Sequence, residues 1–207
     1  ISGFGQAGPY ASRPGFDQII QGMSGLMSLT GSPDGEPMRA GIAVSDTSAG
    51  MFLGQGILLA LLERQQTGRG QWVHTSLLEA MLSKLDFQGS RYTMDGDSPG
   101  REGNHHPTAA PMGVFRASDG FVNLAATSGR MWRAFCTTLS LDALLEDHRF
   151  ETNELRVKHR EALIELIESK TAQKTQASLI TELNAIGCPC GPIYTVAEAF
   201  DDPQARA

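Results

Sequence analysis

The pattern of apolar and polar residues predicts a helical beginning to the chain. Within residues 17–27 the apolar side chains recur on one side of a helix. Within residues 51–62 they occur nearly all round, which is typical of a helix that is covered on most sides. This second helix follows Asp46, runs to about Gln66 and is closed by Gly68. We therefore expect a short amphipathic helix and then a long buried one.

The next residues add a strand, a helix and a linker. Residues 71–75 have the pattern of a short strand, and residues 77–87 that of a helix. Helix, tight loop, strand and helix in this order are typical of α/β proteins. Residues 89–107 are rich in Gly, Asp, Ser, Pro and His and contain few apolar residues, which is the composition of a linker between packed domains. The first domain is therefore expected to be α/β and to end at residue 88.

Beyond this linker the pattern predicts a smaller α+β domain over residues 108–195. The dipeptide Asp119-Gly120 lies between the apolar runs 113–117 and 121–125, which is a strong signal of a β-hairpin. Three helices and a last short strand are expected at 129–139, 154–172, 175–186 and 189–194. The domain is therefore a hairpin sheet covered by helices.

Composition and charge limit the type of chain and the partners that it can bind. The 207 residues are 41% hydrophobic and 19% charged, so the chain is globular and can bury one good core or two small ones. A net charge of −6 without a basic cluster argues against a surface that binds nucleic acid or an anionic membrane, because both rely on Lys and Arg to meet phosphate. Residues 51–62 are too few and too rich in glycine to span a bilayer, and there is no secretory signal. Three cysteines, an odd number, indicate a reducing, cytoplasmic setting.

Asp46 is the main candidate for chemistry. A carboxylate in the first turn of a helix is held ionised by the unpaired N–H groups there, and beside a core it could act as a nucleophile. The alternative is that Asp46 is only the N-cap of the helix, and local sequence leaves both open. Gly50, Gly54 and Gly56 follow it, each at a cost of about 1 kcal/mol relative to Ala in a helix interior. Close packing is the favoured explanation, and close approach of a ligand is the alternative.

Three other motifs favour structural interpretations. Gly3-x-Gly5-x-x-Gly8 has the spacing of a dinucleotide site, but the prolines at 9 and 14 prevent the helix that such a site needs. His105-His106 has no further partners for a metal site. Cys188 and Cys190 have no neighbouring base, and their spacing is too close for a zinc or redox hairpin, so we expect small core residues. No metal or dinucleotide is therefore expected.

The motifs occur in an order that is similar to a known family. They are Gly3-Phe4-Gly5-Gln6-Ala7-Gly8-Pro9-Tyr10, Arg13-Pro14-Gly15-Phe16-Asp17, Met23-Ser24-Gly25-Leu26-Met27, Thr30-Gly31, Asp46, Leu59-Ala60-Leu61-Leu62-Glu63-Arg64, Thr67-Gly68-Arg69-Gly70-Gln71, the hairpin, Gly187-Cys188-Pro189-Cys190-Gly191-Pro192 and Asp202-Pro203-Gln204. Together they resemble class III CoA-transferases of the CaiB/BaiF type, which include formyl-CoA transferase. The resemblance covers essentially the whole chain.

The resemblance implies a fold and an assembly. Residues 1–88 would be part of a large Rossmann-like domain, and 196–207 would begin a segment that returns to it. The chain begins with Ile1, without an initiator Met, and family members are about twice as long, so it is expected to be an internal piece that lacks most of the CoA contacts. The family forms interlocked homodimers, and the linker 89–107 would serve the threading of the two chains.

The resemblance also implies a chemistry. Asp46 would carry CoA between carboxylic acids through a mixed anhydride and an aspartyl-CoA thioester, with an acyl-CoA and an acid as substrates and no permanently bound cofactor. Gly15, Phe16, Asp17 and Gln18 would border CoA by their position in the motif, although the Lys and Tyr of oxalate-type relatives are replaced here by glycine and aspartate. Residues 107–111 stand where some relatives carry a glycine-rich loop over the aspartate, and here they are not glycine.

Two alternatives remain from the sequence. Family members that racemise α-methylacyl-CoA have a histidine where this chain has Phe16 and a glutamate near the position of Ser128. Proton abstraction and return need acid-base groups on both faces of the α-carbon, and only Asp46 is kept. The other alternative is a noncatalytic scaffold, because the expected N-terminal CoA site is missing. Binding of acyl-CoA by the full-length protein would discriminate between enzyme and scaffold.

Overall fold

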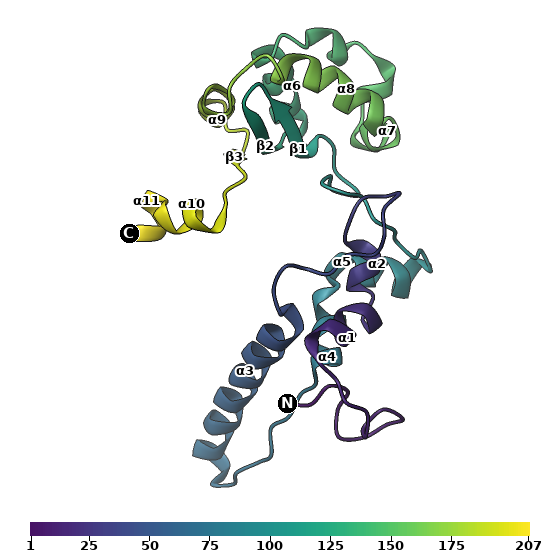
Figure 1. The fold of residues 1–207 in the computed structure, drawn as a ribbon, viewed down its shortest axis with the longest axis vertical. Coiled ribbons are helices and arrows are strands. Elements are labelled where there is room, and N and C mark those ends of the chain that lie inside the picture. The colour runs from purple at the N-terminus through teal and green to yellow at the C-terminus, as the bar shows by residue number, and fades with distance from the viewer. The chain divides into compact units, whose positions relative to one another are not determined.

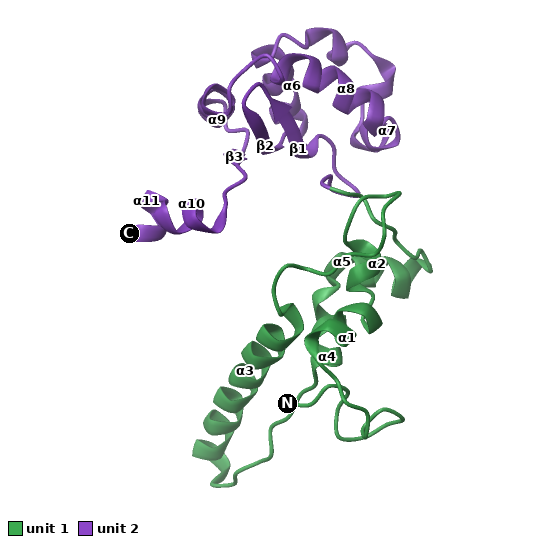
Figure 2. Cartoon of the chain, viewed as in Figure 1, with its two compact units in different colours: residues 1–103 green, residues 104–207 purple.

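A computed structural model describes residues 1–207 as two compact units. Unit 1 comprises residues 1–103 and unit 2 residues 104–207 (Figure 2). The chain contains both helices and a sheet (Figure 1), as the sequence predicts, but the sheet lies entirely within unit 2. Each unit has its own hydrophobic core, so each is described separately.

Unit 1 is helical. Its elements are α1 (Asp17–Met23), α2 (Leu26–Leu29), α3 (Val44–Thr67), α4 (Leu77–Lys84), α5 (Asp86–Ser90) and the π-helix η1 (Arg91–Asp95). The single helix predicted over 17–27 is interrupted at Gly25, whose φ of 92° lies in the left-handed region that ends a helix. The helices α1, α3 and α4 contact one another around a small core made of Ile20, Ala49, Leu77, Ala80 and Met81.

The strand predicted over residues 71–75 does not form. The only sheet-like pairing in unit 1 is a single parallel bridge between Ser2 and Ser76, with Leu77 N–H donating to the Ser2 carbonyl at 2.9 Å. A strand needs a neighbouring strand to pair its backbone groups, and unit 1 supplies one residue of it. The segment therefore returns from α3 to α4 as extended chain.

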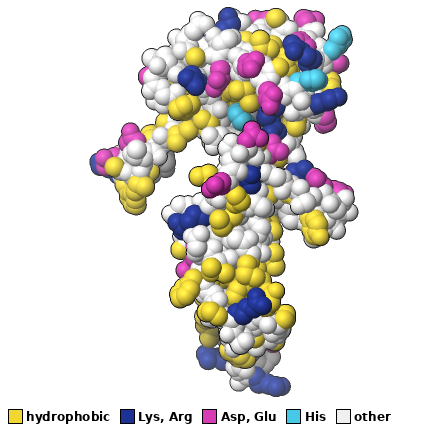
Figure 3. All heavy atoms as spheres, turned by 45° about the vertical axis from the view of Figure 1, so that its right-hand side comes forward, with side chains coloured by type: hydrophobic (Ala, Val, Ile, Leu, Met, Phe, Trp, Pro, Cys, Tyr) yellow, Lys and Arg dark blue, Asp and Glu magenta, His cyan; other side chains and the backbone are white.

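The long helix α3 begins and ends close to where the sequence places it, with Gly68 at φ 67° closing it. The expectation that it is covered on most sides is wrong for this chain, because only Ser45, Ser48 and Ala49 are buried. Its exposed apolar side chains are Met51, Ile57, Leu58, Leu59, Leu61 and Leu62. Hydrophobic side chains on the surface of unit 1 are visible in Figure 3.

By length and composition alone α3 is also suited to cross a membrane. It spans 24 residues, and 17% of its most apolar window is buried. The helix is twice as long as the apolar run of residues 51–62. The expectation that this segment is too short to span a bilayer is therefore wrong. The same composition is equally typical of a core helix in a soluble protein.

Unit 2 is a three-stranded antiparallel sheet packed against helices. The strands β1 (Met112–Ala117), β2 (Gly120–Ala125) and β3 (Cys190–Pro192) lie in the order β1-β2-β3. The helices are α6 (Gly129–Thr138), η2 (Asp142–Leu145), η3 (His148–Phe150), α7 (Asn153–Lys158), α8 (Arg160–Thr171), α9 (Gln176–Ala185), α10 (Val196–Asp201) and α11 (Pro203–Arg206), of which η2 and η3 are 3-10 helices. The predicted hairpin is confirmed, with Val114 opposite Asn123.

The core of unit 2 follows the alternation of the strands. Phe115 of β1 and Val122 and Leu124 of β2 are buried, whereas their neighbours along each strand face outward. Leu163 and Ile167 of α8 pack in the same core, as their spacing of one helical turn predicts. The helix predicted over 154–172 is broken at residue 159, which leaves α7 and α8 as separate elements.

Candidate functional site

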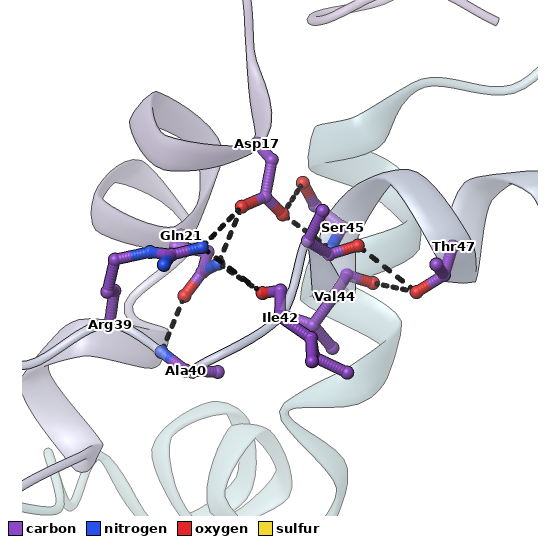
Figure 4. Close-up of polar contacts among 9 residues, drawn as sticks. Asp17, Gln21, Arg39, Ala40, Ile42, Val44, Ser45 and Thr47 are labelled. Carbon is purple, nitrogen blue, oxygen red and sulfur yellow. Dashed lines mark hydrogen bonds and ion pairs between the residues drawn. The ribbon is translucent and has the colours of Figure 1, made fainter. Parts of the chain in front are cut away.

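The start of α3 is held by a side chain from α1. Asp17 is the first residue of α1 and is 8% exposed. Its Oδ1 accepts hydrogen bonds from the backbone N–H of Ser45 at 2.9 Å and from Ser45 Oγ at 2.7 Å (Figure 4). The residue at the N-cap position of α3 is Ala43, which has no side-chain acceptor. The cap of this helix therefore comes from 28 residues earlier in the chain.

Gln21 extends this contact to the segment before α3. It lies one turn after Asp17, is fully buried, and donates from Nε2 to Asp17 Oδ2 at 2.7 Å and to the Ile42 carbonyl at 3.1 Å. Its Oε1 accepts from the Ala40 N–H at 2.9 Å (Figure 4). Both ends of the amide are used, so the approach to α3 is fixed by side-chain hydrogen bonds.

The Asp17 carboxylate is stabilised in its ionised form. Burial acts to raise the pKa of Asp17, but the hydrogen bonds from Ser45 and Gln21 outweigh it and hold the pKa below its ordinary value. The Arg39 guanidinium, 3.6 Å away, acts in the same direction. A charged acceptor bonds the helix end more strongly than a neutral one, so α1 and α3 are joined by a charge-assisted contact.

Asp46 is the third residue of α3 and is exposed. The interpretation of Asp46 as the N-cap is therefore wrong, because the N-cap position belongs to Ala43. The expectation that Asp46 lies beside the core is also wrong, since the apolar run that suggested a covered helix is itself exposed. The Asp46 side chain makes no hydrogen bond and no ion pair within the chain. It is a free carboxylate in the first turn, where the helix dipole favours negative charge.

The three glycines of α3 differ in their surroundings. A Cβ at Gly56 would lie 2.8 Å from Val73 Cγ1, so close packing explains this glycine, as the sequence predicts. A Cβ at Gly50 or Gly54 would meet no atom within 4 Å. Gly50 lies one turn after Asp46, so there is open space beside the carboxylate.

The four residues predicted to border CoA differ in their exposure to solvent. Gly15 packs back to back against Gly3, where a Cβ would come within 2.8 Å of the Gly3 Cα. Phe16 is 76% exposed, and Gln18 is exposed as well. Asp17 points inward with both oxygens bonded, so its carboxylate is not offered to a ligand. The sequence placed Asp17 at the CoA surface and missed its bond to α3.

The glycine motif at the beginning of the chain forms turns and bends, and α1 opens only at Asp17. Gly5 and Gly8 have φ values of 93° and 91°, which serve tight turns. The prediction that this motif is not the start of a helix is confirmed, and a dinucleotide would find no helix N-terminus there.

In unit 2, polar side chains hold residues 106–110, which overlap the segment expected to stand where some relatives carry a glycine-rich loop. Asn153 donates to the Thr108 carbonyl at 2.8 Å and accepts from the Ala110 N–H at 3.1 Å. Arg156 Nε donates to the Ala110 carbonyl at 2.7 Å, and Arg160 Nη2 to the carbonyl of His106 at 2.8 Å. The segment is therefore bound to α7 and α8 along its length.

The remaining candidates are structural. Cys188 is fully buried, and burial raises the pKa of its thiol to about 11, so it is not a thiolate at neutral pH. The same cause raises the pKa of Cys190, which is partly buried, to about 11. The prediction that the two cysteines are packing residues is confirmed. No group of three His, Cys, Asp or Glu side chains is placed to hold a metal ion.

Comparisons with known proteins agree on one family. The model of CoA-transferase family III matches residues 1–207. The chain is 40% identical over its full length to succinate--glutarate CoA-transferase of Agrobacterium fabrum and covers 52% of that protein. It is 36% identical over its full length to acetyl-CoA:oxalate CoA-transferase of Acetobacter aceti and covers 53% of that protein. A CAIB/BAIF family protein from Brucella suis has 42% identity and a TM-score of 0.85, with 99% of this chain and 54% of that one covered. The chain spans about half the length of the curated relatives that it matches.

Proposed function

This chain belongs to CoA-transferase family III, and from that premise we propose that the full-length protein transfers CoA between carboxylic acids with Asp46 as nucleophile. The observation that carries the proposal is the free carboxylate of Asp46 in the first turn of α3. The N–H of Ser45 in the same turn is bonded by Asp17, which Gln21 in turn holds. A carboxylate without hydrogen bonds keeps its lone pairs available for attack on a carbonyl carbon.

The proposed reaction exchanges one acyl bond for another at each step. A carboxylate oxygen of Asp46 attacks the thioester carbonyl carbon of the donor. The C–S bond breaks, CoA leaves as its thiolate, and the donor acyl group stays on Asp46 as a mixed anhydride. The thiolate then attacks the aspartyl carbonyl carbon, which releases the donor acid and leaves an aspartyl-CoA thioester. The acceptor carboxylate runs the same steps in reverse, so acyl activation is conserved throughout and no bound cofactor is expected.

The anhydride must be protected from water while it lasts. Within unit 1 Asp46 is exposed, so we expect the protection to come from protein outside this unit. We propose that further surfaces cover α3 and its carboxylate in the full-length protein, as a homodimer of interlocked chains in the cytoplasm. The exposed apolar side chains of α3 support this. A monomeric mass in solution scattering would contradict the dimer.

For the substrates we propose short dicarboxylates. Relatives at 40% and 32% identity are named for succinate or succinyl-CoA with glutarate, and one at 36% for acetyl-CoA and oxalate. We therefore expect succinyl-CoA to be a productive donor and glutarate and oxalate to be the first acceptors to test.

Racemisation is the less favoured alternative. Phe16 has no titratable group where the racemase pattern has histidine. Ser128 is the N-cap of α6, and its Oγ accepts from the Met131 N–H at 3.4 Å. Neither position supplies an acid or a base for a second face of the α-carbon. Transfer needs only Asp46.

The test is mass spectrometry of the full-length protein after incubation with succinyl-CoA and hydroxylamine. Hydroxylamine captures an activated aspartyl carbonyl, so a hydroxamate is expected on the peptide that contains Asp46. Asp46→Ala removes the acceptor, and Asp34→Ala, an exposed carboxylate in a turn of unit 1, is the matched control. Labelling that persists in Asp46→Ala would contradict the nucleophile. CoA binding without any labelling would favour the scaffold.

A further inference from the structure

Three helix starts of this chain carry a carboxylate at the third helical residue, and they use it in two ways. In α4, Glu79 folds back to accept from the N–H of Ser76 at 2.8 Å. In α10, Glu198 does the same with the N–H of Thr195 at 2.7 Å. Both are capping boxes, in which the carboxylate is spent on the helix end. In α3 the equivalent residue, Asp46, is not bonded.

In α3 the side-chain acceptor for the first turn comes from Asp17, whereas α4 and α10 use the Ser or Thr hydroxyl at their own N-cap. Ala43 cannot cap α3, and an uncapped first turn leaves N–H groups that a nearby carboxylate on the same turn would satisfy. The Asp17 carboxylate, brought from α1, takes the N–H of Ser45. Gln21 holds the other oxygen of Asp17 and the backbone of the preceding segment.

We propose that Asp17 is a positioning residue for Asp46: it caps α3 from α1, fixes the first turn, and leaves the Asp46 carboxylate unbonded for attack on the thioester. This role rests on the proposed function of Asp46. It assigns two carboxylates at one helix start to separate tasks. Without Asp17, the first turn frays or Asp46 turns back to the helix end, and in both cases fewer molecules hold the carboxylate ready.

The experiment measures the rate of hydroxamate formation on Asp46 in a single turnover of the full-length protein with succinyl-CoA and hydroxylamine. The variants are Asp17→Ala, Asp17→Asn, which keeps an acceptor oxygen but loses the charge, and the control Asp34→Ala. Hydrogen exchange of the peptide that covers the first turn of α3 reports the cap without reference to activity.

We expect Asp17→Ala to slow labelling at saturating succinyl-CoA by at least about tenfold, while the half-saturating concentration changes by less than about threefold. Asp17→Asn is expected to recover part of that rate, since it restores one hydrogen bond to Ser45. Exchange in the first turn should rise in Asp17→Ala, and Asp34→Ala should behave as wild type.

The outcomes separate this proposal from the function it rests on. If wild type is labelled and Asp17→Ala is labelled at the same rate, the role of Asp17 is overturned and the function of Asp46 stays intact. Faster exchange with an unchanged rate reduces Asp17 to a structural cap, which also overturns the proposal. Absence of labelling in wild type overturns the function of Asp46 and this role with it. If Asp17→Ala does not fold, Asp17→Asn and Ser45→Ala decide, and wild-type rates in both overturn the proposal.

Discussion

The guanidinium of Arg156 is buried without a carboxylate partner, which makes it a sharp test of the energetics of unit 2. It is 3% exposed, and burial lowers its pKa below the ordinary value. Its three nitrogen atoms each donate one hydrogen bond, to the carbonyls of Ala110 at 2.7 Å, Phe150 at 3.1 Å and Thr127 at 3.2 Å. The guanidinium carbon also lies 5.0 Å from the centre of the Trp132 ring. One side chain thus joins the residues before β1, after β2 and before α7.

Replacing Arg156 by Met keeps most of the volume and removes the donors. A hydrogen bond to a charged group contributes a net of about 1.5–3 kcal/mol, so one to two such bonds account for about 3 kcal/mol. The three bonds of one buried group do not add in full, and water reaching the vacated carbonyls recovers part of the loss. We expect a net loss of about 3 kcal/mol, which lowers the melting temperature by about 6–12 °C for a chain of this size.

Thermal and urea unfolding, followed by circular dichroism, measure this change. Arg133 is the matched control, because it lines the same hollow of about 610 Å³ but is exposed, and Arg133→Met should shift stability by less than about 0.5 kcal/mol. Equal melting temperatures for Arg156→Met and wild type would refute the claim that these three bonds contribute to stability. Equal losses in both variants would assign the effect to charge in general.

Three further changes have expected outcomes. Ser76→Ala removes the capping box of α4 and should cost about 1 kcal/mol in urea unfolding, while an unchanged midpoint would show that the helix end is rehydrated freely. Gly50→Ala should stabilise α3 by up to about 1 kcal/mol, since a Cβ there meets open space. It should also slow CoA transfer if the acyl group of the substrate occupies that space, and a wild-type transfer rate would exclude that position for the acyl group. The pKa of Asp17 is lower in the folded state, so its contribution is complete above the unfolded pKa and is lost as pH falls through the folded one. The stability difference between wild type and Asp17→Asn should therefore shrink as the pH falls below about 4, and a constant difference in acid urea titrations would contradict the role of the charge.

Local signals predicted local structure well. The hairpin follows from Asp119-Gly120 because the turn is made by adjacent residues, and the end of α3 follows from Gly68 because a left-handed residue stops a helix. The exposure of α3 could not be predicted, since an apolar run reports what a helix needs and not what covers it. The strand predicted over residues 71–75 does not form for a related reason, because a strand needs a neighbouring strand to pair its backbone groups.

The sequence placed Asp46 beside a core, whereas Asp46 is exposed. It did not predict that the Asp17 carboxylate is buried and bonded to the start of α3, and the expected position of Asp17 beside CoA stays a prediction. The contact that decides this joins residues 28 apart, so no window of local sequence contains it. Two signals do point to it: the spacing of Asp17 and Gln21 puts both side chains on one face of α1, and Ala43 leaves the next helix without a cap of its own. At the start of α3 the acceptor comes from Asp17 in another helix, and the Asp46 carboxylate in the first turn makes no bond to the helix end.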